Sequence, residues 1–230
     1  VLLGACTFRL WARCPQDDLM SNLPTPDALI FDLDGTLWDT CETCARAWNG
    51  VLARHGIAFR TITADDVRRV TGKPHDACIR DTFLGLPEPQ LELLNRETAV
   101  EDNLAIERCG GQLYEGVAEG VRTLARSYPL YIVSNCQAGY IELFLRSSGL
   151  APHFRDFECW GNTGQPKPEN LRQLIARNAV KSPWFIGDAT GDMQAAEACN
   201  VTFVHAAYGF GQVERAALRI GTFRDLVNAV

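Results

Sequence analysis

The sequence predicts an α/β protein: a doubly wound, Rossmann-like parallel sheet with a helical segment inserted near its start. Two observations lead to this prediction. From about residue 112 to the end, short apolar runs alternate with amphipathic stretches, which is typical of parallel strands covered by helices on both faces. Between about 40 and 110, helical periodicity recurs and no strand pattern is found, so a bundle of helices is expected there.

The first strand is expected over residues 28–31, Ala-Leu-Ile-Phe. This run is short and apolar, and it is bounded by Pro26 on one side and Gly35 on the other. Both features are typical of a buried strand.

The inserted segment should begin with a helix over 41–55, which carries Trp48 on its apolar face and stops at Gly56. A second helix is expected after Thr63, because threonine is a good N-cap and an acidic first turn follows it. Further helices are expected over 75–84 and 88–109.

The alternating part should contribute the rest of the sheet and its covering helices. Ligands of such sheets bind outside the carboxyl ends of the strands, so functional residues are expected directly after the apolar runs. The expected strands are 130–133, 157–160, 184–187 and 201–204, and the expected helices are 117–127, 138–148, 168–178 and 192–199.

Composition narrows the class of protein. The chain has 230 residues, 47% of them hydrophobic and 22% charged, with a net charge of −6, which is ordinary for a globular protein with a substantial core. It contains neither a basic tract nor interleaved aromatic and basic residues, so nucleic acid is not an expected partner. No apolar run reaches the roughly 18 residues of a membrane span, so no membrane partner is expected.

The nine cysteines are odd in number and scattered, which favours reduced thiols and a cytoplasmic location. Cys41 and Cys44 have the spacing of half a zinc site, but no second pair at zinc spacing accompanies them. Residues 1–19 are interpreted as a tail outside the core, with Met20 as a natural start.

Two carboxylates follow the first strand. Asp32 and Asp34 stand two residues apart, and a Gly-Thr turn comes next. At strand spacing both side chains would project from one face, and burying two acids is costly unless a ligand offsets their charge. A hard cation together with a phosphate would do so, whereas a solvated turn is the alternative interpretation.

Four short pieces, taken together, resemble the haloacid dehalogenase (HAD) superfamily, in particular its phosphoglycolate phosphatase and β-phosphoglucomutase-like branch with a helical cap. They are Asp32-Leu33-Asp34-Gly35-Thr36, Val133-Ser134-Asn135, Lys167-Pro168 and the run 187–192, Gly-Asp-Ala-Thr-Gly-Asp. The resemblance covers roughly residues 27–230. It implies a core domain of 20–38 and 112–230 and a cap domain of 39–111.

The resemblance assigns roles to the acids. Asp32 would be the nucleophile that becomes an aspartyl-phosphate, and Asp34 would be the general acid and then the general base. Asp32 and Asp188, with the main-chain carbonyl of Asp34, would bind Mg²⁺, whose preferred ligands are oxygens. Asp192 would orient waters or Lys167, although capping of its own helix is a comparable interpretation.

The remaining site residues would bind phosphate or select the substrate. The resemblance assigns Ser134 and Asn135 to the phosphoryl oxygens. Lys167 stands at the start of a helix, where a cation opposes the helix dipole unless an anion lies between them. Lys73, in the inserted segment, would meet a second charge on the substrate, or would be an ordinary solvated lysine.

The expected function is therefore Mg²⁺-dependent hydrolysis of a small phosphomonoester, either phosphoglycolate-like or a sugar phosphate. A phosphomutase is the main alternative, but mutase relatives carry a histidine just after the first motif, and residues 41–45 contain none. A haloacid dehalogenase would lack the second acid, Asp34. A non-catalytic binding protein would lack at least one of Asp32, Asp34, Lys167 and Asp188, and all four are present. The oligomeric state stays open.

Overall fold

The computed structural model describes residues 23–230, so the predicted 1–19 tail and Met20 lie outside the described residues. A six-stranded sheet in the order β5-β4-β1-β6-β7-β8 forms the centre, and all of its neighbouring strands are parallel. This confirms the predicted fold class. The strands are β1 (Ala28–Phe31), β4 (Leu130–Ser134), β5 (Phe154–Cys159), β6 (Pro183–Gly187), β7 (Thr202–Ala206) and β8 (Leu218–Ile220).

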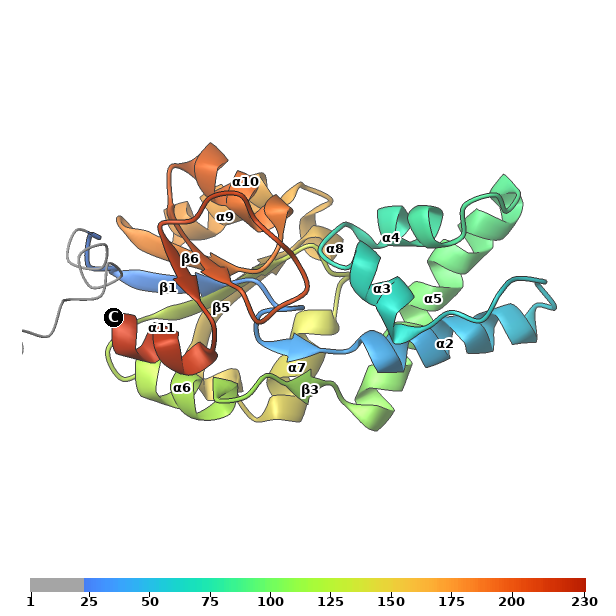
Figure 1. The fold of residues 1–230 in the computed structure, drawn as a ribbon, viewed down its shortest axis with the longest axis horizontal. Helices are drawn as coiled ribbons and strands as arrows, with labels where there is room; N and C mark the ends of the chain where they lie inside the picture. Colours follow the sequence, from blue (N-terminus) through green and yellow to red (C-terminus); the bar gives the residue numbers. More distant parts are fainter. Residues whose placement is uncertain (1–22) are drawn as a thin grey trace, which may run out of the picture.

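Helices cover both faces of the sheet (Figure 1). Alternation along β1 sends Leu29 and Phe31 to one face and Ala28 and Ile30 to the other. All four residues of β1 are fully buried, as expected for a central strand of a parallel sheet that is covered on both faces. The first face packs against α6 (Val117–Leu124), α7 (Tyr140–Ser148) and α11 (Phe223–Ala229), and the second against α9 (Lys167–Arg177) and α10 (Thr190–Cys199).

Four helices lie between β2 (Trp38–Asp39) and β3 (Gln112–Leu113) in the chain and project from one end of the sheet (Figure 1). We call them the helical segment: α2 (Cys41–Arg54), α3 (Ala64–Val70), α4 (His75–Thr82) and α5 (Glu88–Cys109). The predicted N-cap of α3 is confirmed, because Thr63 Oγ1 accepts from the Asp66 N–H at 3.2 Å. Description of this segment as a separate cap domain over 39–111 stays a prediction.

The helical segment is attached through a small two-stranded sheet. Strand β2 (Trp38–Asp39) enters the segment, β3 (Gln112–Leu113) leaves it, and the two pair antiparallel. Sequence patterns missed both strands, and also β8 and α11. The three missed strands are only two or three residues long, too short to show an alternating pattern.

Other boundaries shift by a few residues. The strand predicted over 157–160 begins at Phe154, and Trp160 instead opens the short helix α8 (Trp160–Thr163). The helix predicted from 192 begins at Thr190, and the strand predicted over 201–204 is Thr202–Ala206. A short 3-10 helix, η1 (Ala151–His153), precedes β5.

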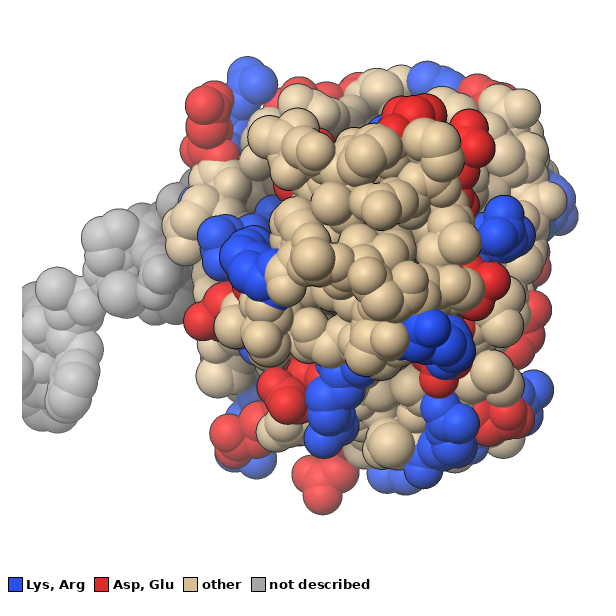
Figure 2. Space-filling model, turned by 90° about the vertical axis from the view of Figure 1, so that its right-hand side faces the viewer, with Lys and Arg blue, Asp and Glu red and all other residues tan. Residues whose placement is uncertain are grey.

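The described residues also bear on two expectations from composition. Within 23–230, none of the helices combines the length and the hydropathy that crossing a bilayer requires. The seven cysteines of this range are all free thiols. Figure 2 shows the end of the molecule formed by the helical segment, where basic and acidic side chains surround an area without charged side chains.

Candidate active site

The sheet order brings the predicted site residues to one edge. Strand β1 lies between β4 and β6, with Phe31 beside both Ile132 and Ile186. Asp32 directly follows β1, Ser134 ends β4, and Asp188 directly follows β6. Since parallel strands end at the same edge, these three positions meet there, at the point where chain connections diverge and α/β sheets bind ligands.

Three buried carboxylates gather around one ammonium group. Single oxygen atoms of Asp32, Asp188 and Asp192 all lie within 4.8 Å of one another. Lys167 Nζ donates to Asp32 Oδ1 at 2.7 Å and to Asp192 Oδ1 at 2.6 Å, and all four side chains are buried. We call Asp32, Asp188, Asp192 and Lys167 the acid cluster.

The charges of the acid cluster do not balance. Burial, and then the charge of Asp192, raise the pKa of Asp32 well above its ordinary value, although Lys167 lowers it. Burial and the charge of Asp192 likewise raise the pKa of Asp188 to about 7. Burial lowers the pKa of Lys167, but the charges of Asp192 and Asp32 outweigh it and the net shift is upward. One cation facing three carboxylates favours a further cation.

The loops around Asp188 are shaped to hold its carboxylate. The N–H groups of Phe210 and Gly211 donate to Asp188 Oδ2 at 2.7 and 3.1 Å. Gly35 has a φ of +82°, and a Cβ there would overlap the Asp188 carboxylate. Glycine is therefore required in the first motif for two reasons: the left-handed backbone and the close approach of Asp188.

The acid cluster fits a hard divalent cation. Its donors are carboxylate oxygens, which Mg²⁺ prefers. Among the described residues, no protein donor reaches Asp32 Oδ2 or Asp188 Oδ1. Both oxygens of Asp192 are engaged, since Oδ1 accepts from Lys167 and Oδ2 from the Ala189 N–H at 3.0 Å. The two contacts proposed for Asp192, to Lys167 and to the start of its own helix, thus occur together.

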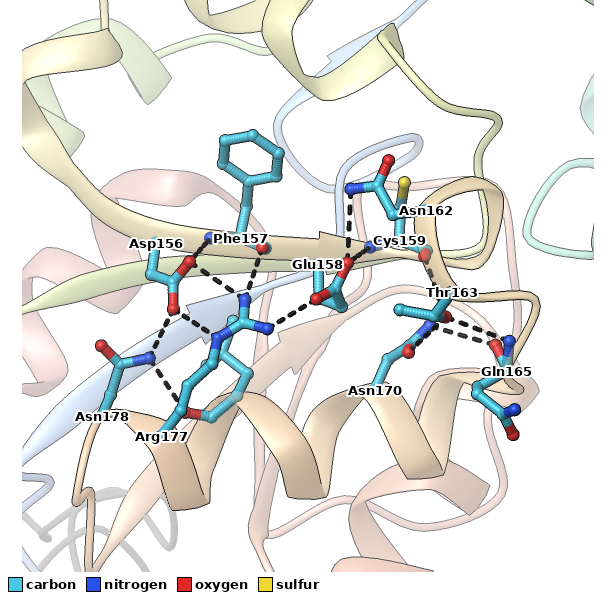
Figure 3. A network of polar contacts seen from close by, with 11 residues as sticks. Asp156, Phe157, Glu158, Cys159, Asn162, Thr163, Gln165, Asn170, Arg177 and Asn178 are labelled. Atoms are coloured by element: carbon cyan, nitrogen blue, oxygen red, sulfur yellow. Dashed lines mark hydrogen bonds and ion pairs between the residues drawn. The ribbon is translucent and has the colours of Figure 1, made fainter.

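Helix α9 holds Lys167 at its first residue and is fixed at its other end by a polar network (Figure 3). Arg177, the last residue of α9, donates to Asp156 Oδ2 at 2.7 Å and to Glu158 Oε2 at 2.5 Å. Both acids lie on the edge strand β5. A cation at a helix C-terminus also interacts favourably with the helix dipole. The network therefore sets where the N-terminal end of α9 places Lys167.

Asp34 is held by neutral donors rather than by a cation. Tyr140 Oη donates to Asp34 Oδ1 at 2.7 Å, and Thr40 Oγ1 lies 2.6 Å from Tyr140 Oη and 3.4 Å from the same carboxylate oxygen. Burial raises the pKa of Asp34 to about 6, although the Tyr140 hydrogen bond lowers it. Sequence reasoning missed Tyr140 and Thr40, because each belongs to an ordinary helix start with no motif of its own.

Ser134 and Asn135, at the end of β4, line the same cavity as Asp32 and Asp34. Ser134 Oγ accepts from the Cys136 N–H at 3.3 Å, so its own hydroxyl hydrogen is available to a ligand. Asn135 Nδ2 donates to the Gly72 carbonyl at 2.8 Å, across to the helical segment. Lys73, which follows Gly72 in the chain, is half-exposed and donates to Asp81 Oδ2 at 2.6 Å.

One cavity joins Asp32 of the acid cluster with Asp34 and with the two residues at the end of β4. It leaves about 60 Å³ for the centres of water-sized molecules, which is room for a few waters. Asp32, Asp34, Ser134, Asn135 and Lys73 all line it. Its walls from the helical segment also include residues that sequence reasoning did not assign to the site, among them Trp48, His75 and Asp102.

Comparison with known proteins places this site in a family context. The sequence profile of the family described as haloacid dehalogenase-like hydrolase matches residues 29–206. A phosphoglycolate phosphatase of Colwellia psychrerythraea is 30% identical over 207 residues, which are 84% of this chain and 89% of that protein. A phosphoglycolate phosphatase of Synechococcus elongatus is 31% identical over 186 residues, 80% of this chain and 84% of the relative.

Solved structures share the fold. A haloacid dehalogenase-like hydrolase from Bacteroides fragilis superposes with a TM-score of 0.77 at 24% identity, covering 88% of this chain and all of the other. A protein described as a predicted phosphoglycolate phosphatase from Haemophilus somnus gives a TM-score of 0.77 at 21% identity, covering 88% and 96%.

Proposed function

Because the chain belongs to the haloacid dehalogenase-like hydrolase family, we propose that it is a phosphatase that hydrolyses a small phosphomonoester through an aspartyl-phosphate on Asp32. The observation that supports this most directly is the placement of Asp32. Its Oδ1 is bound to Lys167 at 2.7 Å, and its side chain lines the cavity that Ser134 and Asn135 also line. The relatives named phosphoglycolate phosphatase support the same reaction class.

In this proposal Asp32 attacks phosphorus in line with the leaving oxygen. A carboxylate is a weak nucleophile toward an anionic phosphate, so the reaction depends on positioning and on charge neutralisation. The ammonium of Lys167 lowers the pKa of Asp32 against the effect of burial, which favours the ionised nucleophile, and it offsets the charge of the phosphoryl group. The free hydroxyl hydrogen of Ser134 and the second Nδ2 hydrogen of Asn135 are suited to phosphoryl oxygens.

Asp34 is proposed to act first as the general acid and then as the general base. A carboxyl with a pKa of about 6 can protonate the leaving alcohol oxygen and then accept a proton from water in the second half of the reaction. Tyr140 holds Asp34 at one oxygen and leaves the other, Oδ2, with no donor among the described residues. Tyr140 is therefore a positioning residue in this scheme.

Asp32 and Asp188 are proposed to bind Mg²⁺, together with the main-chain carbonyl of Asp34, while Asp192 orients Lys167. When bound, Mg²⁺ would neutralise the excess charge of the acid cluster and polarise the transferring phosphoryl group. The free oxygens of Asp32 and Asp188 are the observation that supports this assignment.

The helical segment is proposed to act as a cap, over 39–111, on a core of 20–38 and 112–230. The hydrogen bond from Asn135 to the Gly72 carbonyl joins the two parts directly over the cavity. A cap of this kind admits the substrate when open and excludes bulk water when closed. Lys73 is proposed to contact the substrate at the cavity mouth. The free thiols of the described cysteines support a cytoplasmic location.

The test is phosphate release from a panel of phosphomonoesters in Mg²⁺ and in excess chelator. The panel includes phosphoglycolate, sugar phosphates, nucleotides and an aryl phosphate. We expect Mg²⁺-dependent release that the chelator abolishes. Release that persists in chelator would refute the metal assignment. No release from any compound would refute the phosphatase and favour a mutase or a binding protein.

A further inference from the structure

The far wall of the cavity consists of side chains that the proposed phosphoryl chemistry does not use. Trp48 from α2, His75 from α4 and Asp102 from α5 line the same cavity as Asp32 and Asp34. All three are buried, and Asp102 is only 3% exposed. A buried carboxylate that no Lys or Arg contacts is costly, so its surroundings require an explanation.

Asp102 has one strong neutral donor and spare accepting capacity. Trp48 Nε1 donates to Asp102 at 3.0 Å from Oδ1 and 3.1 Å from Oδ2, so a single N–H is shared between both oxygens. A carboxylate can accept about four hydrogen bonds. Burial raises the pKa of Asp102 to about 7, although the Trp48 hydrogen bond lowers it.

The hydrogen bonds of His75 assign its tautomer. Thr98 Oγ1 donates its only hydrogen to the Leu94 carbonyl at 2.6 Å, so the 2.9 Å contact between His75 Nε2 and Thr98 Oγ1 requires a hydrogen on Nε2. Burial lowers the pKa of His75 to about 4, so the ring is neutral near pH 7. His75 Nδ1 is then an acceptor, and it lies 3.9 Å from Asp102 Oδ2.

Two acceptors therefore stand beside each other on the cavity wall, and we call His75 Nδ1 and the Asp102 carboxylate the acceptor pair. A hydroxyl or ammonium group could donate to both. Above about pH 7, where Asp102 is ionised, a carboxylate would bring a second negative charge and no donor. Among the described residues that line the cavity, the only lysine is Lys73, and it is bound to Asp81.

We propose that the acceptor pair binds a hydrogen-bond-donating group, a hydroxyl or an ammonium, on the alcohol part of the substrate and discriminates against a carboxylate there. This inference rests on the proposed phosphatase function and names the class of its substrate. It predicts a preferred substrate other than the phosphoglycolate in the names of the relatives. The acceptor pair determines specificity and takes no part in the phosphoryl transfer itself.

The first test uses the unaltered protein and matched substrates. Ethyl phosphate, 2-hydroxyethyl phosphate, O-phosphoethanolamine and phosphoglycolate differ only at the far end, and glycerol 3-phosphate with 3-phosphoglycerate repeats the contrast at greater length. We expect kcat/KM for the best hydroxyl or ammonium compound to exceed that for its carboxylate and apolar counterparts by at least about tenfold. The ranking of hydroxyl against ammonium identifies which donor is preferred. Equal rates, or preference for a carboxylate compound, would overturn the inference.

The second test is Asp102→Asn, with Glu101→Gln on the same helix as the matched control. Asparagine keeps an acceptor for Trp48 but replaces the other oxygen with a donor. We expect the ratio of kcat/KM for the preferred substrate to that for ethyl phosphate to fall about tenfold in Asp102→Asn, mainly through KM, and to be unchanged in Glu101→Gln. If Asp102 has only a structural role, all substrates will lose the same factor.

The two proposals fail in different ways. If no phosphomonoester, including the aryl phosphate, is hydrolysed, the phosphatase function fails. If the aryl phosphate and phosphoglycolate are both hydrolysed and the carboxylate compound is preferred, only the acceptor pair is refuted.

Discussion

The acid cluster and the acceptor pair bury their carboxylates in different ways, and one cavity connects Asp32 of the first with both residues of the second. Asp32 and Asp192 share the ammonium of Lys167, whereas Asp102 accepts from the neutral N–H of Trp48 and contacts no lysine or arginine among the described residues. The acid cluster has more carboxylates than cations, so in our proposal a bound metal ion balances its charge and allows a phosphate to bind beside it. The second holds its carboxylate beside a neutral ring and suits a hydroxyl or an ammonium donor. In our two proposals, the cavity therefore binds the phosphate of the substrate beside Asp32 and a hydroxyl or ammonium group of the same substrate beside Asp102.

The strongest test of this contrast is Asp32→Asn. An amide has nearly the same shape but cannot form the aspartyl-phosphate, so we expect kcat to fall at least about 1000-fold. Steady-state phosphate release measures the loss, with the exposed Asp65→Asn as control. Substantial activity in Asp32→Asn would show that the chemistry does not depend on this carboxylate.

Lys167→Met should have the next largest effect, on stability as well as turnover. Removing one partner of a buried ion pair leaves uncompensated charge and costs roughly 3–5 kcal/mol. We expect a lower melting temperature in chelator and a larger stabilisation by Mg²⁺ than in the unaltered protein, because the metal would replace part of the lost positive charge. Equal melting temperatures in chelator would contradict the charge imbalance inferred for the acid cluster.

Asp102→Asn should change how stability depends on pH. The folded-state pKa of Asp102 is raised from 3.8 to about 7, so folding favours its protonated form. This contribution is present below pH 3.8 and is lost as the pH rises toward 7. We therefore expect the free energy of unfolding of the variant, relative to the unaltered protein, to rise by on the order of 2 kcal/mol between pH 5 and pH 8. Denaturant melts at both pH values measure it, and a pH-independent difference would argue against a buried, ionisable Asp102.

Tyr140→Phe should have the smallest effect, and it tests Asp34, whose partners are neutral like those of Asp102. Loss of one hydrogen bond costs about 1 kcal/mol, so we expect roughly fivefold lower kcat and a slightly reduced stability. Tyr208→Phe is the matched control, because Tyr208 Oη donates to the Thr36 carbonyl at 2.8 Å instead of to a site carboxylate. Equal losses in kcat for the two variants would remove Tyr140 from the site.

The two ends of the cavity also differed in how far the sequence could predict them. Asp32, Ser134 and Asp188 follow apolar runs, and parallel strands bring their carboxyl ends together, so local pattern predicts their proximity. Trp48, His75 and Asp102 come from three helices and follow no spacing rule. Trp48 was interpreted as part of a buried helix face, and it is buried, but periodicity cannot say which buried residues border a cavity.

The antiparallel pairing of Trp38 with Leu113 has a consequence for how such a protein can diverge. The chain enters the helical segment through β2 and leaves it through β3. Because these two strands pair with each other, the helical segment is an insertion whose two ends lie side by side. An insertion of this kind can gain, lose or exchange residues without moving β1 or β4. Mutations in the cavity residues of the helical segment can therefore accumulate without disturbing the site residues at the ends of β1, β4 and β6. A lineage can change the molecule it consumes while keeping the reaction it performs.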